Sequence, residues 1–441
     1  MKATHLPATL LLILSSALAP AEAVKDREGA VRNDRATMEN DARWIYNDYH
    51  KGFAEARRTG KPLLVVLRCV PCLACMGLDA HVLSAEELAP LLKQFVCVRL
   101  INANALDLAK FQFDYDLSLS AMFFNADGTV YGRFGSWTHQ KDPTAKTITG
   151  FQRALEAAQV IHRNYPANKA SLAGKQGGPA PHATTLEIPG LAGEYKRELD
   201  WEGKVVKSCV HCHQIGDAYR TWYRERNLAV PMALVYPMPM PETIGLTLEP
   251  DQIARIESIA QVSIAAEAGL RAGDEIVSLN AQPVISVADV SWVLHRSPES
   301  GSIPVVVKRG GAELTLALAL PAGWRMHSDI SRRVGTWGMR AMTGGGMVLE
   351  DLPNVERSQR NLAENALALR VNYVGEYGKH AAAKKAGFAK DDIIVALGEN
   401  KARLTEGELM GTLLRDTRPG DKLKATVLRG TQRLEFTLPM Q

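Results

Sequence analysis

The sequence has little cysteine, little excess of charge of one sign and no long hydrophobic run. Only six of its 441 residues are cysteine, too few for a small scaffold stapled by disulfides. The 52 Lys and Arg residues nearly balance 48 Asp and Glu, so the composition does not indicate nucleic acid as the main partner. With 46% hydrophobic residues the chain can still build cores, and its length predicts about three domains.

The N-terminus is typical of a secretory signal. Lys2 is followed by an apolar run at residues 9–19 and by the small-x-small pattern of residues 21–23. That run is about half of the roughly 20 residues that a membrane-spanning helix needs, so an uncleaved anchor is the less favoured alternative. We expect a signal peptide at residues 1–23 and an exported protein, periplasmic or secreted, with no membrane span. Such compartments allow disulfides and attached haem to persist.

Residues 41–163 read as an α/β domain, preceded by a loose charged stretch at residues 24–40. Apolar spacing predicts the helices, buried apolar runs predict the strands, and an Asp-Gly turn predicts a hairpin. The expected elements are a helix at 41–58, strands at 63–67 and 95–101, a hairpin at 121–134 and a closing helix at 144–163.

The remainder divides by composition and by an internal repeat. The pattern Ala-Gly-Leu-x-x-Gly-Asp-x-Ile-x-x-Leu at residues 268–279 recurs in altered form at 386–397, which indicates two copies of one module. Gly- and Pro-rich stretches indicate linkers between folded parts. The predicted order is a linker at 164–195, a short cysteine-bearing segment at 196–241, a module at 242–321, a linker at 322–344 and a second module at 345–441.

The first cysteine cluster contains two overlapping C-x-x-C pairs, formed by Cys69, Cys72 and Cys75 after a predicted strand. A thiol at a helix N-terminus is stabilised as the thiolate, and a second thiol one turn away can resolve a mixed disulfide. The alternatives are a structural disulfide or a metal site, for which His81 is the nearby fourth ligand. Cys97 reads as a core residue.

The second cluster, Cys209-Val-His-Cys212-His213, matches the C-x-x-C-H attachment site of haem c. There the two thiols bond to the haem and the adjacent imidazole binds the iron. We therefore expect haem c at Cys209 and Cys212, with His213 as the metal ligand. The alternatives are a disulfide-forming pair that is a partner of the first cluster, or a Cys/Cys/His/His metal site. The candidates for the sixth iron ligand are Met238, Met240 and Met232.

The region from Lys61–Leu67 through the first cluster to the hairpin resembles the thioredoxin family. The resemblance implies that Cys72 is the nucleophile and that Cys75, or the extra Cys69, resolves the mixed disulfide. The sequence departs from the family at two positions, with Pro71 in place of its tryptophan and Ser120 in place of its cis-proline.

The repeated pattern resembles PDZ domains of bacterial exported proteins. In those domains an apolar-Gly-apolar loop binds a peptide C-terminus, and Ile244, Gly245 and Leu246 match this loop in the first copy. In the second copy Asp391 replaces the usual glycine, and residues 344–347 are one candidate for the loop. The resemblance implies protein clients or C-terminal peptides as partners.

Taken together, residues 41–440 resemble a bacterial thioredoxin-like/PDZ domain-containing protein family, some of whose members carry selenocysteine. The implied fold is multidomain α/β plus mainly-β: a thioredoxin-like α/β domain, the C-x-x-C-H segment and two PDZ-like domains. The leading hypothesis is an exported thiol-disulfide redox protein, a possible thiol-disulfide oxidoreductase that acts with a redox partner protein. The alternatives are a haem-based electron-transfer or sensor protein and a non-enzymatic PDZ scaffold.

Overall fold

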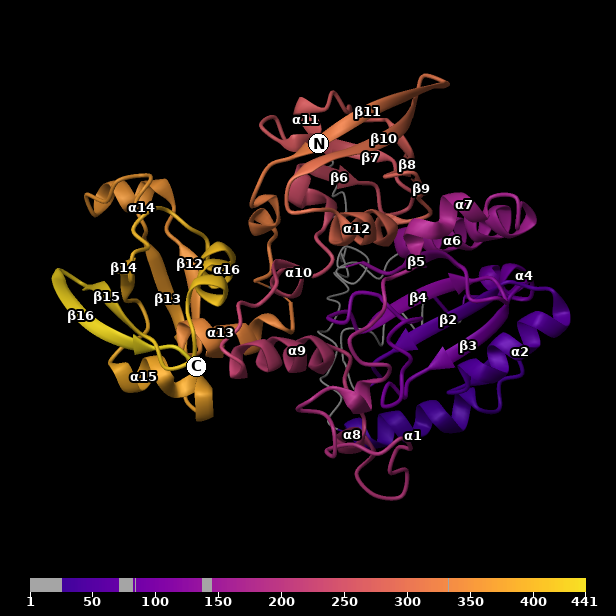
Figure 1. The fold of residues 1–441 in the computed structure, drawn as a ribbon, viewed down its shortest axis with the longest axis horizontal. Coiled ribbons are helices and arrows are strands. Elements are labelled where there is room, and N and C mark those ends of the chain that lie inside the picture. Colours follow the sequence, from indigo (N-terminus) through magenta and orange to yellow (C-terminus); the bar gives the residue numbers. More distant parts are fainter. Residues whose placement is uncertain (1–25, 71–81, 84, 137–144, 332) are drawn as a thin grey trace, which may run out of the picture.

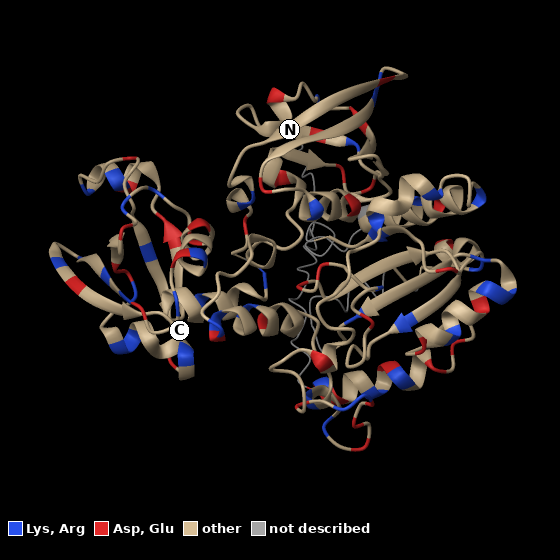
Figure 2. Cartoon of the chain, viewed as in Figure 1, with Lys and Arg blue, Asp and Glu red and all other residues tan. Residues whose placement is uncertain are grey.

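The computed structural model describes residues 26–441 except 71–81, 84, 137–144 and 332. The predicted signal peptide, Cys72, Cys75 and His81 lie outside the described residues. Figure 1 shows three bodies: an N-terminal domain (residues 26–163), a first module (242–321) and a second module (345–441). A bridging segment (164–241) and a connector (322–344) join them. Lys and Arg alternate with Asp and Glu over all three bodies (Figure 2).

The N-terminal domain is a five-stranded sheet with helices on both faces. The strand order is β1-β3-β2-β4-β5, in which β1, β3 and β2 run parallel and β4 and β5 pair antiparallel. Its elements are α1 (Arg27–Met38), β1 (Trp44–Tyr46), α2 (Tyr49–Thr59), β2 (Leu63–Arg68), η3 (Glu86–Leu88), α4 (Ala89–Leu92), β3 (Val96–Leu100), β4 (Leu119–Phe124), β5 (Val130–Phe134) and α6 (Ala145–Arg163).

Alternation along β2 divides the core of this domain between the two faces of the sheet. Leu64 and Val66 pack with residues of α4 and α6, whereas Leu63 and Val65 pack with residues of α2. All four are fully buried, as expected for a strand covered on both faces. Cys97 is buried on β3 on the α6 side, so it is a core residue, as expected.

Two expectations for the start of the domain are wrong. The stretch predicted to be loose is ordered over its described residues 26–40, because helix α1 is capped by Asp26 and packs its buried Val31 against α8 of the bridging segment. Residues 41–58 are not one helix. Trp44 pairs with Cys97 as part of β1, and Asn47 then turns the chain with a positive φ of 55°. Asp48 caps α2 by accepting a hydrogen bond from Lys51 N.

The bridging segment packs against its neighbours, so residues 164–195, predicted as a linker, are not a loose connection. Leu172, Lys175 and Ile188 are buried at 1%, 1% and 0% exposure. Each contacts the N-terminal domain or the first module, so the two bodies are held together. The elements of the segment are α7 (Lys169–Leu172), η4 (Ala173–Lys175), η5 (Thr185–Glu187), α8 (Val205–Ser208), α9 (His213–Glu225), α10 (Met232–Val235) and η6 (Pro241–Ile244).

The first module places short helices against two small sheets, with strand orders β11-β10-β8-β9 and β6-β7. Its elements are β6 (Leu246–Leu248), β7 (Ile256–Ile259), α11 (Ile264–Glu267), β8 (Glu275–Leu279), β9 (Gln282–Pro283), α12 (Val287–Arg296), β10 (Gly301–Arg309) and β11 (Ala312–Leu320). Figure 1 shows α12 on the side of this module that faces β5.

The second module has a similar order of elements in one sheet, β12-β13-β14-β15-β16, but adds α14 between its first two strands and has no separate strand at the place of β9. Its elements are β12 (Met347–Asp351), α14 (Asn354–Gln359), β13 (Leu369–Val374), η8 (Gly378–Ala381), α15 (Ala382–Ala386), β14 (Ile393–Leu397), α16 (Glu406–Asp416), β15 (Lys422–Arg429) and β16 (Gln432–Pro439). The connector, predicted as a second linker, forms η7 (Trp324–His327) and α13 (Thr336–Gly344), and both pack on α16.

Candidate functional site

The first cysteine cluster begins at the C-terminal end of β2, the central strand of the N-terminal sheet. The backbone N–H of Cys69 donates to Ser118 O at 2.9 Å, which fixes the chain as it leaves the strand. Ser120, at the position of the family's proline, is buried on β4 opposite Leu67. The described part of the cluster is therefore anchored to the rigid sheet at Cys69.

The C-x-x-C-H segment packs on the α2 face of the same sheet. Val210 and Ile215 are buried in the core that also holds α2. The fully buried Asn104 holds the segment, since its side-chain nitrogen donates to Ser208 O and its oxygen accepts from Val210 N, both at 2.7 Å. The segment is therefore an integral part of the N-terminal core.

This packing brings the two cysteine clusters together. Cys69 Sγ lies 3.2 Å from Nδ1 of His211, one of the two residues between the cysteines of the second cluster. Cys69, Cys209, Cys212 and His211 all line one small cavity of about 20 Å³, room for about one water molecule. Three of the six cysteines therefore share one site, although 140 residues of sequence separate the first from the others.

Burial determines the protonation of the groups around this cavity. It raises the pKa of the Cys209 thiol to about 11, because a thiolate is poorly solvated there. Burial also lowers the pKa of His211, and the neighbouring His213 lowers it further. At neutral pH the structure thus holds Cys209 as a thiol and His211 as a neutral imidazole.

The residues predicted to hold haem do not fit that group in this arrangement. His213 does not line the cavity of the two cysteines. Its ring lines a second cavity of about 750 Å³ between α9 and the second module, and its Nδ1 lies 3.3 Å from Asp217. Haem c requires the two sulfurs and the imidazole at a single macrocycle, and the cysteine cavity is far too small for one. The haem stays a prediction.

The predicted sixth ligands also lie elsewhere. Met238 is buried in the core of the first module, and Met240 Sδ accepts a hydrogen bond from Ser291 at 3.8 Å. Neither methionine lines a cavity with His213. Within the described part of the chain, no group of three or more His, Cys, Asp and Glu side chains is arranged to hold a metal ion.

The predicted peptide-binding loop precedes β6. Ile244 ends η6, Gly245 turns the chain with a φ of 83°, and Leu246 begins the strand. A Cβ on Gly245 would lie 2.2 Å from that of Ser263, so glycine is required here. Among the described strands β6 pairs with β7 alone, which leaves one edge where a peptide strand can add.

The corresponding loop of the second module is residues 344–347. Gly346 takes the place of Gly245. The carbonyl of Gly346 accepts a hydrogen bond from Gly375 N, just after β13, and the carbonyl of Gly245 accepts one from Ala260 N, just after β7. The backbone N–H of Leu349, on edge strand β12 of this module, already donates a hydrogen bond to Oε1 of Glu406 on α16 at 2.9 Å.

Comparison with protein families agrees with two parts of this geometry. A model of thioredoxin-like domains matches residues 44–126, and a model of PDZ domains matches residues 255–309. The chain is a thioredoxin-like and PDZ domain-containing protein. The thioredoxin-like match runs from β1 to β4 of the N-terminal domain, and the PDZ match covers β7 to β10 of the first module. No curated protein matches the chain.

Solved structures similar to this thioredoxin-like and PDZ domain-containing protein include three complexes of the HtrA-type protease AlgW. A variant with a decapeptide is 16% identical over 32% of this chain and 48% of that chain, with a TM-score of 0.20. The decapeptide complex of AlgW itself is 18% identical over 31% of this chain and 48% of that chain, with a TM-score of 0.19. The tripeptide complex is 16% identical over 31% of this chain and 52% of that chain, with a TM-score of 0.20. The matched part spans about half of those protease chains.

Sequence reasoning about this thioredoxin-like and PDZ domain-containing protein missed two residues of the site. His211 was left without a role, because nothing in the local pattern shows that it faces a cysteine of the other cluster. Asn104 was not singled out at all. A polar residue in an apolar stretch after a buried strand is a signal for it, since a buried amide needs backbone partners.

Proposed function

We propose that this chain is an exported thiol-disulfide redox protein that acts on protein clients. The observation that supports this most directly is the shared cavity of Cys69, Cys209 and Cys212, with His211 against Cys69. A thioredoxin-like domain and a PDZ domain fit such a combination of redox chemistry and protein binding. In this proposal the second cluster is the redox partner of the first.

The exchange with a client is a two-electron step. The thiolate of Cys72 attacks one sulfur of a client disulfide, forms a new S–S bond to it and expels the other client sulfur, which takes up a proton. Cys75 or Cys69 then attacks Cys72, releases the second client thiol and leaves a disulfide in the first cluster. The client gains two electrons from the protein and two protons, one from the resolving thiol and one from water.

The second cluster returns those electrons. The thiolate of Cys212 attacks the disulfide of the first cluster, bonds to one sulfur and expels the other, which takes up a proton. Cys209 then gives up its proton and attacks Cys212, which leaves a Cys209–Cys212 disulfide that an external redox partner protein reduces. Cys69 is the point of transfer, because it shares the cavity with both of them. His211 orients the Cys69 sulfur from 3.2 Å. The reverse direction of electron flow uses the same contacts.

The PDZ domain supplies the client contact in this proposal. Ile244, Gly245 and Leu246 bind the end of a client peptide at the open edge of β6. The second module is a second PDZ-like domain, supported by its similar order of elements and by the matching position of Gly346.

The test is the thiol state of the natively exported chain, measured by intact mass after rapid alkylation with and without reduction. In Cys72→Ser we expect no exchange with a disulfide substrate. In the double variant Cys209→Ser, Cys212→Ser we expect one turnover, after which the first cluster stays oxidised. Cys97→Ala is the matched control, because this thiol is buried in the core and its pKa is raised to about 12.

Three outcomes contradict the proposal. Unchanged exchange in Cys72→Ser removes the nucleophile assignment. A haem covalently attached to Cys209 and Cys212, in protein made with a competent maturation system, would exclude these two thiols as the reductant of the first cluster. It would also confirm the haem predicted from the sequence. If neither cluster changes its redox state while tail peptides still bind, the protein is a non-enzymatic scaffold.

A further inference from the structure

The free edges of strands β6 and β12 occupy matching positions in the two modules. Each strand follows a loop glycine, Gly245 or Gly346, whose carbonyl accepts a hydrogen bond from the chain just after the paired strand. Bonds to the paired strand come from every second residue of an antiparallel strand. The backbone N–H groups of Leu248 and Leu349, each three residues after its glycine, therefore point to the free edge. An added peptide strand would accept hydrogen bonds from these two groups.

A carboxylate of the protein occupies the second of these donors. The N–H of Leu349 donates to Oε1 of Glu406 at 2.9 Å, and Glu406 is the first residue of α16, directly after the N-terminal cap. The residue at the same place in α12 is Val287, whose side chain has no acceptor. The two modules therefore differ at the point where a peptide backbone would pair with the edge.

Helix α13 holds this carboxylate in place. Arg340 of α13 donates to both oxygens of Glu406, at 2.9 and 2.6 Å, and both side chains are buried. Met339, the preceding residue, is 1% exposed and packs with Met410 and Leu414 of α16. Since α13 ends directly before the glycine loop, it lies beside α16 and closes the space between that helix and the edge of β12.

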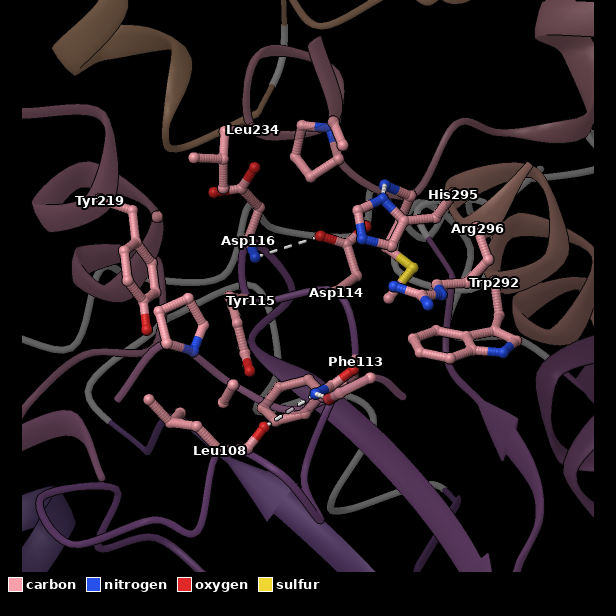
Figure 3. A pocket seen from close by; sticks show the side chains of 18 of the residues that line it. Leu108, Phe113, Asp114, Tyr115, Asp116, Tyr219, Leu234, Trp292, His295 and Arg296 are labelled. Atoms are coloured by element: carbon pink, nitrogen blue, oxygen red, sulfur yellow. Dashed lines mark hydrogen bonds between the residues drawn. The ribbon is translucent and has the colours of Figure 1, made fainter. Parts of the chain in front are cut away.

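The long helix of the first module has different neighbours. Its Trp292 and His295 are directed at a cavity of about 240 Å³ that Leu108 and Tyr115 of the N-terminal domain also line (Figure 3). The element before its glycine loop, η6, has four residues, whereas α13 has nine. Among its described elements the first module thus has no counterpart of the long helix that holds Glu406.

We propose that α13 is an autoinhibitory segment that closes the peptide-binding edge of the second module through Arg340 and Glu406. The chain then has one ready peptide site, at β6, and one closed site, at β12. A peptide C-terminus binds at β12 only when α13 leaves α16, so its apparent affinity is reduced by the fraction of chains that are open. This inference rests on the proposed PDZ-like nature of the second module but not on thiol exchange, so the two can fail separately.

The test is a selection of peptides on the full chain after the first loop has been disabled. Gly245→Val disables it, because the new Cβ would lie 2.2 Å from that of Ser263. The probe is a display library of random peptides with a free C-terminal carboxylate. On this chain we expect no enriched peptide. Glu406→Val copies Val287 and leaves Arg340 buried without its partner, so its addition should yield peptides that bind about 10-fold more tightly or better.

Two further variants control the selection. Arg415→Met in place of Glu406→Val removes an exposed ion pair of α16 and should leave the edge closed. Leu349→Pro in the opened chain removes the N–H group of the edge and should abolish binding of the enriched peptides. If Glu406→Val does not fold by circular dichroism, Met339→Ala weakens the contact of α13 with α16 and should open the same edge.

Hydrogen exchange gives a readout that needs no ligand. In Glu406→Val the amides of residues 347–351 should exchange about 10-fold faster or more than in the unaltered chain, while residues 422–429 of β15 stay unchanged. Three results overturn the proposal: unchanged exchange in Glu406→Val, no enriched peptide on either opened chain, and peptides that bind the Gly245→Val chain but lose binding when Leu349→Pro is added.

Discussion

The first and second modules share one internal contact but differ in what covers their long helices. In the first, Arg309 binds Asp274 at 2.7 Å and donates to Gly269 O at 2.9 Å. In the second, Arg429 binds Asp392 and donates to Gly387 O, both at 2.7 Å. These residues close the same turn in both copies. The outer surfaces have nevertheless acquired different neighbours.

In the first module, α12 covers the edge of the N-terminal sheet. Arg133 N, on edge strand β5, donates to Asp289 at 3.1 Å, and Ser286 donates to Arg133 O. Gly132 allows this approach, because a Cβ there would lie 2.3 Å from Ile285. An edge strand whose polar groups are satisfied in this way cannot pair with another chain.

The ion pair of Lys175 and Asp289 completes this interface. The two groups are 2.7 Å apart and each side chain is 1% exposed. Burial lowers the pKa of Lys175, and the Asp289 carboxylate opposes that effect. The bridging segment, the N-terminal domain and the first module therefore meet at a charge pair that water does not reach.

In the second module, α16 is covered by the connector and by α10 of the bridging segment. Arg340 of α13 binds Glu406 at 2.6 Å, and Glu406 also accepts from Leu349 N. Tyr236 donates to Gly407 O, and a Cβ on Gly411 would lie 2.1 Å from the Tyr236 hydroxyl. One copy of the module thus packs against the N-terminal sheet, whereas the other packs against the connector and the bridging segment.

The largest effect is expected from Lys175→Met. The substitution leaves the Asp289 carboxylate buried without its counter-charge, so we expect a loss of about 3–5 kcal/mol in the free energy of unfolding. Denaturant unfolding measures this. Lys169→Met is the matched control, because Lys169 is 59% exposed beside Asp127 and should change little. Equal effects of the two variants would mean that the interface is open to water.

A smaller loss is expected from Arg340→Met in the second module. Arg340 and Glu406 are 10% and 6% exposed, and Glu406 retains the Leu349 N–H bond, so we expect about 2–3 kcal/mol. The control is Arg415→Met, which removes the exposed ion pair of Arg415 with Asp416 on α16, the helix that also carries Glu406. A larger loss for Arg340→Met than for Lys175→Met would reverse the order of the two interfaces.

The sequence was sufficient for the local parts of this structure and insufficient for the contacts between them. Buried runs and the Asp-Gly turn predicted β2, β3 and the β4–β5 hairpin, and the repeat predicted the shared turn of the modules. Lys175 and Asp289 lie far apart in the sequence, and each looks like a surface residue on its own. The Gly- and Pro-rich composition around Lys175 therefore indicates only a linker.

The candidate site shows the same limit. Both cysteine clusters were found, because cysteine spacing is a local pattern. Their shared cavity depends on Asn104 and on the packing of Val210 and Ile215 against the sheet, which no spacing shows. The C-x-x-C-H pattern by itself favours haem, and the position of His213 in another cavity is a property of the folded chain alone.

The smallest effect concerns the turn that the two modules share. The hydrogen bond from Arg309 is the main cause that lowers the pKa of Asp274, so this carboxylate stabilises the fold above its usual pKa near 4 and loses that contribution as the pH falls through the lowered value. In Arg309→Met the pKa of Asp274 should return towards its usual value. The stability difference from the unaltered chain should therefore be small at neutral pH and should shrink further as the pH falls below about 4. Arg429→Met is its counterpart, and denaturant unfolding at neutral and acid pH compares them. Equal losses in the free energy of unfolding at neutral pH support the same role for this turn in both modules. A clearly larger loss for one variant would show that its turn also stabilises the contacts of that module with its neighbours.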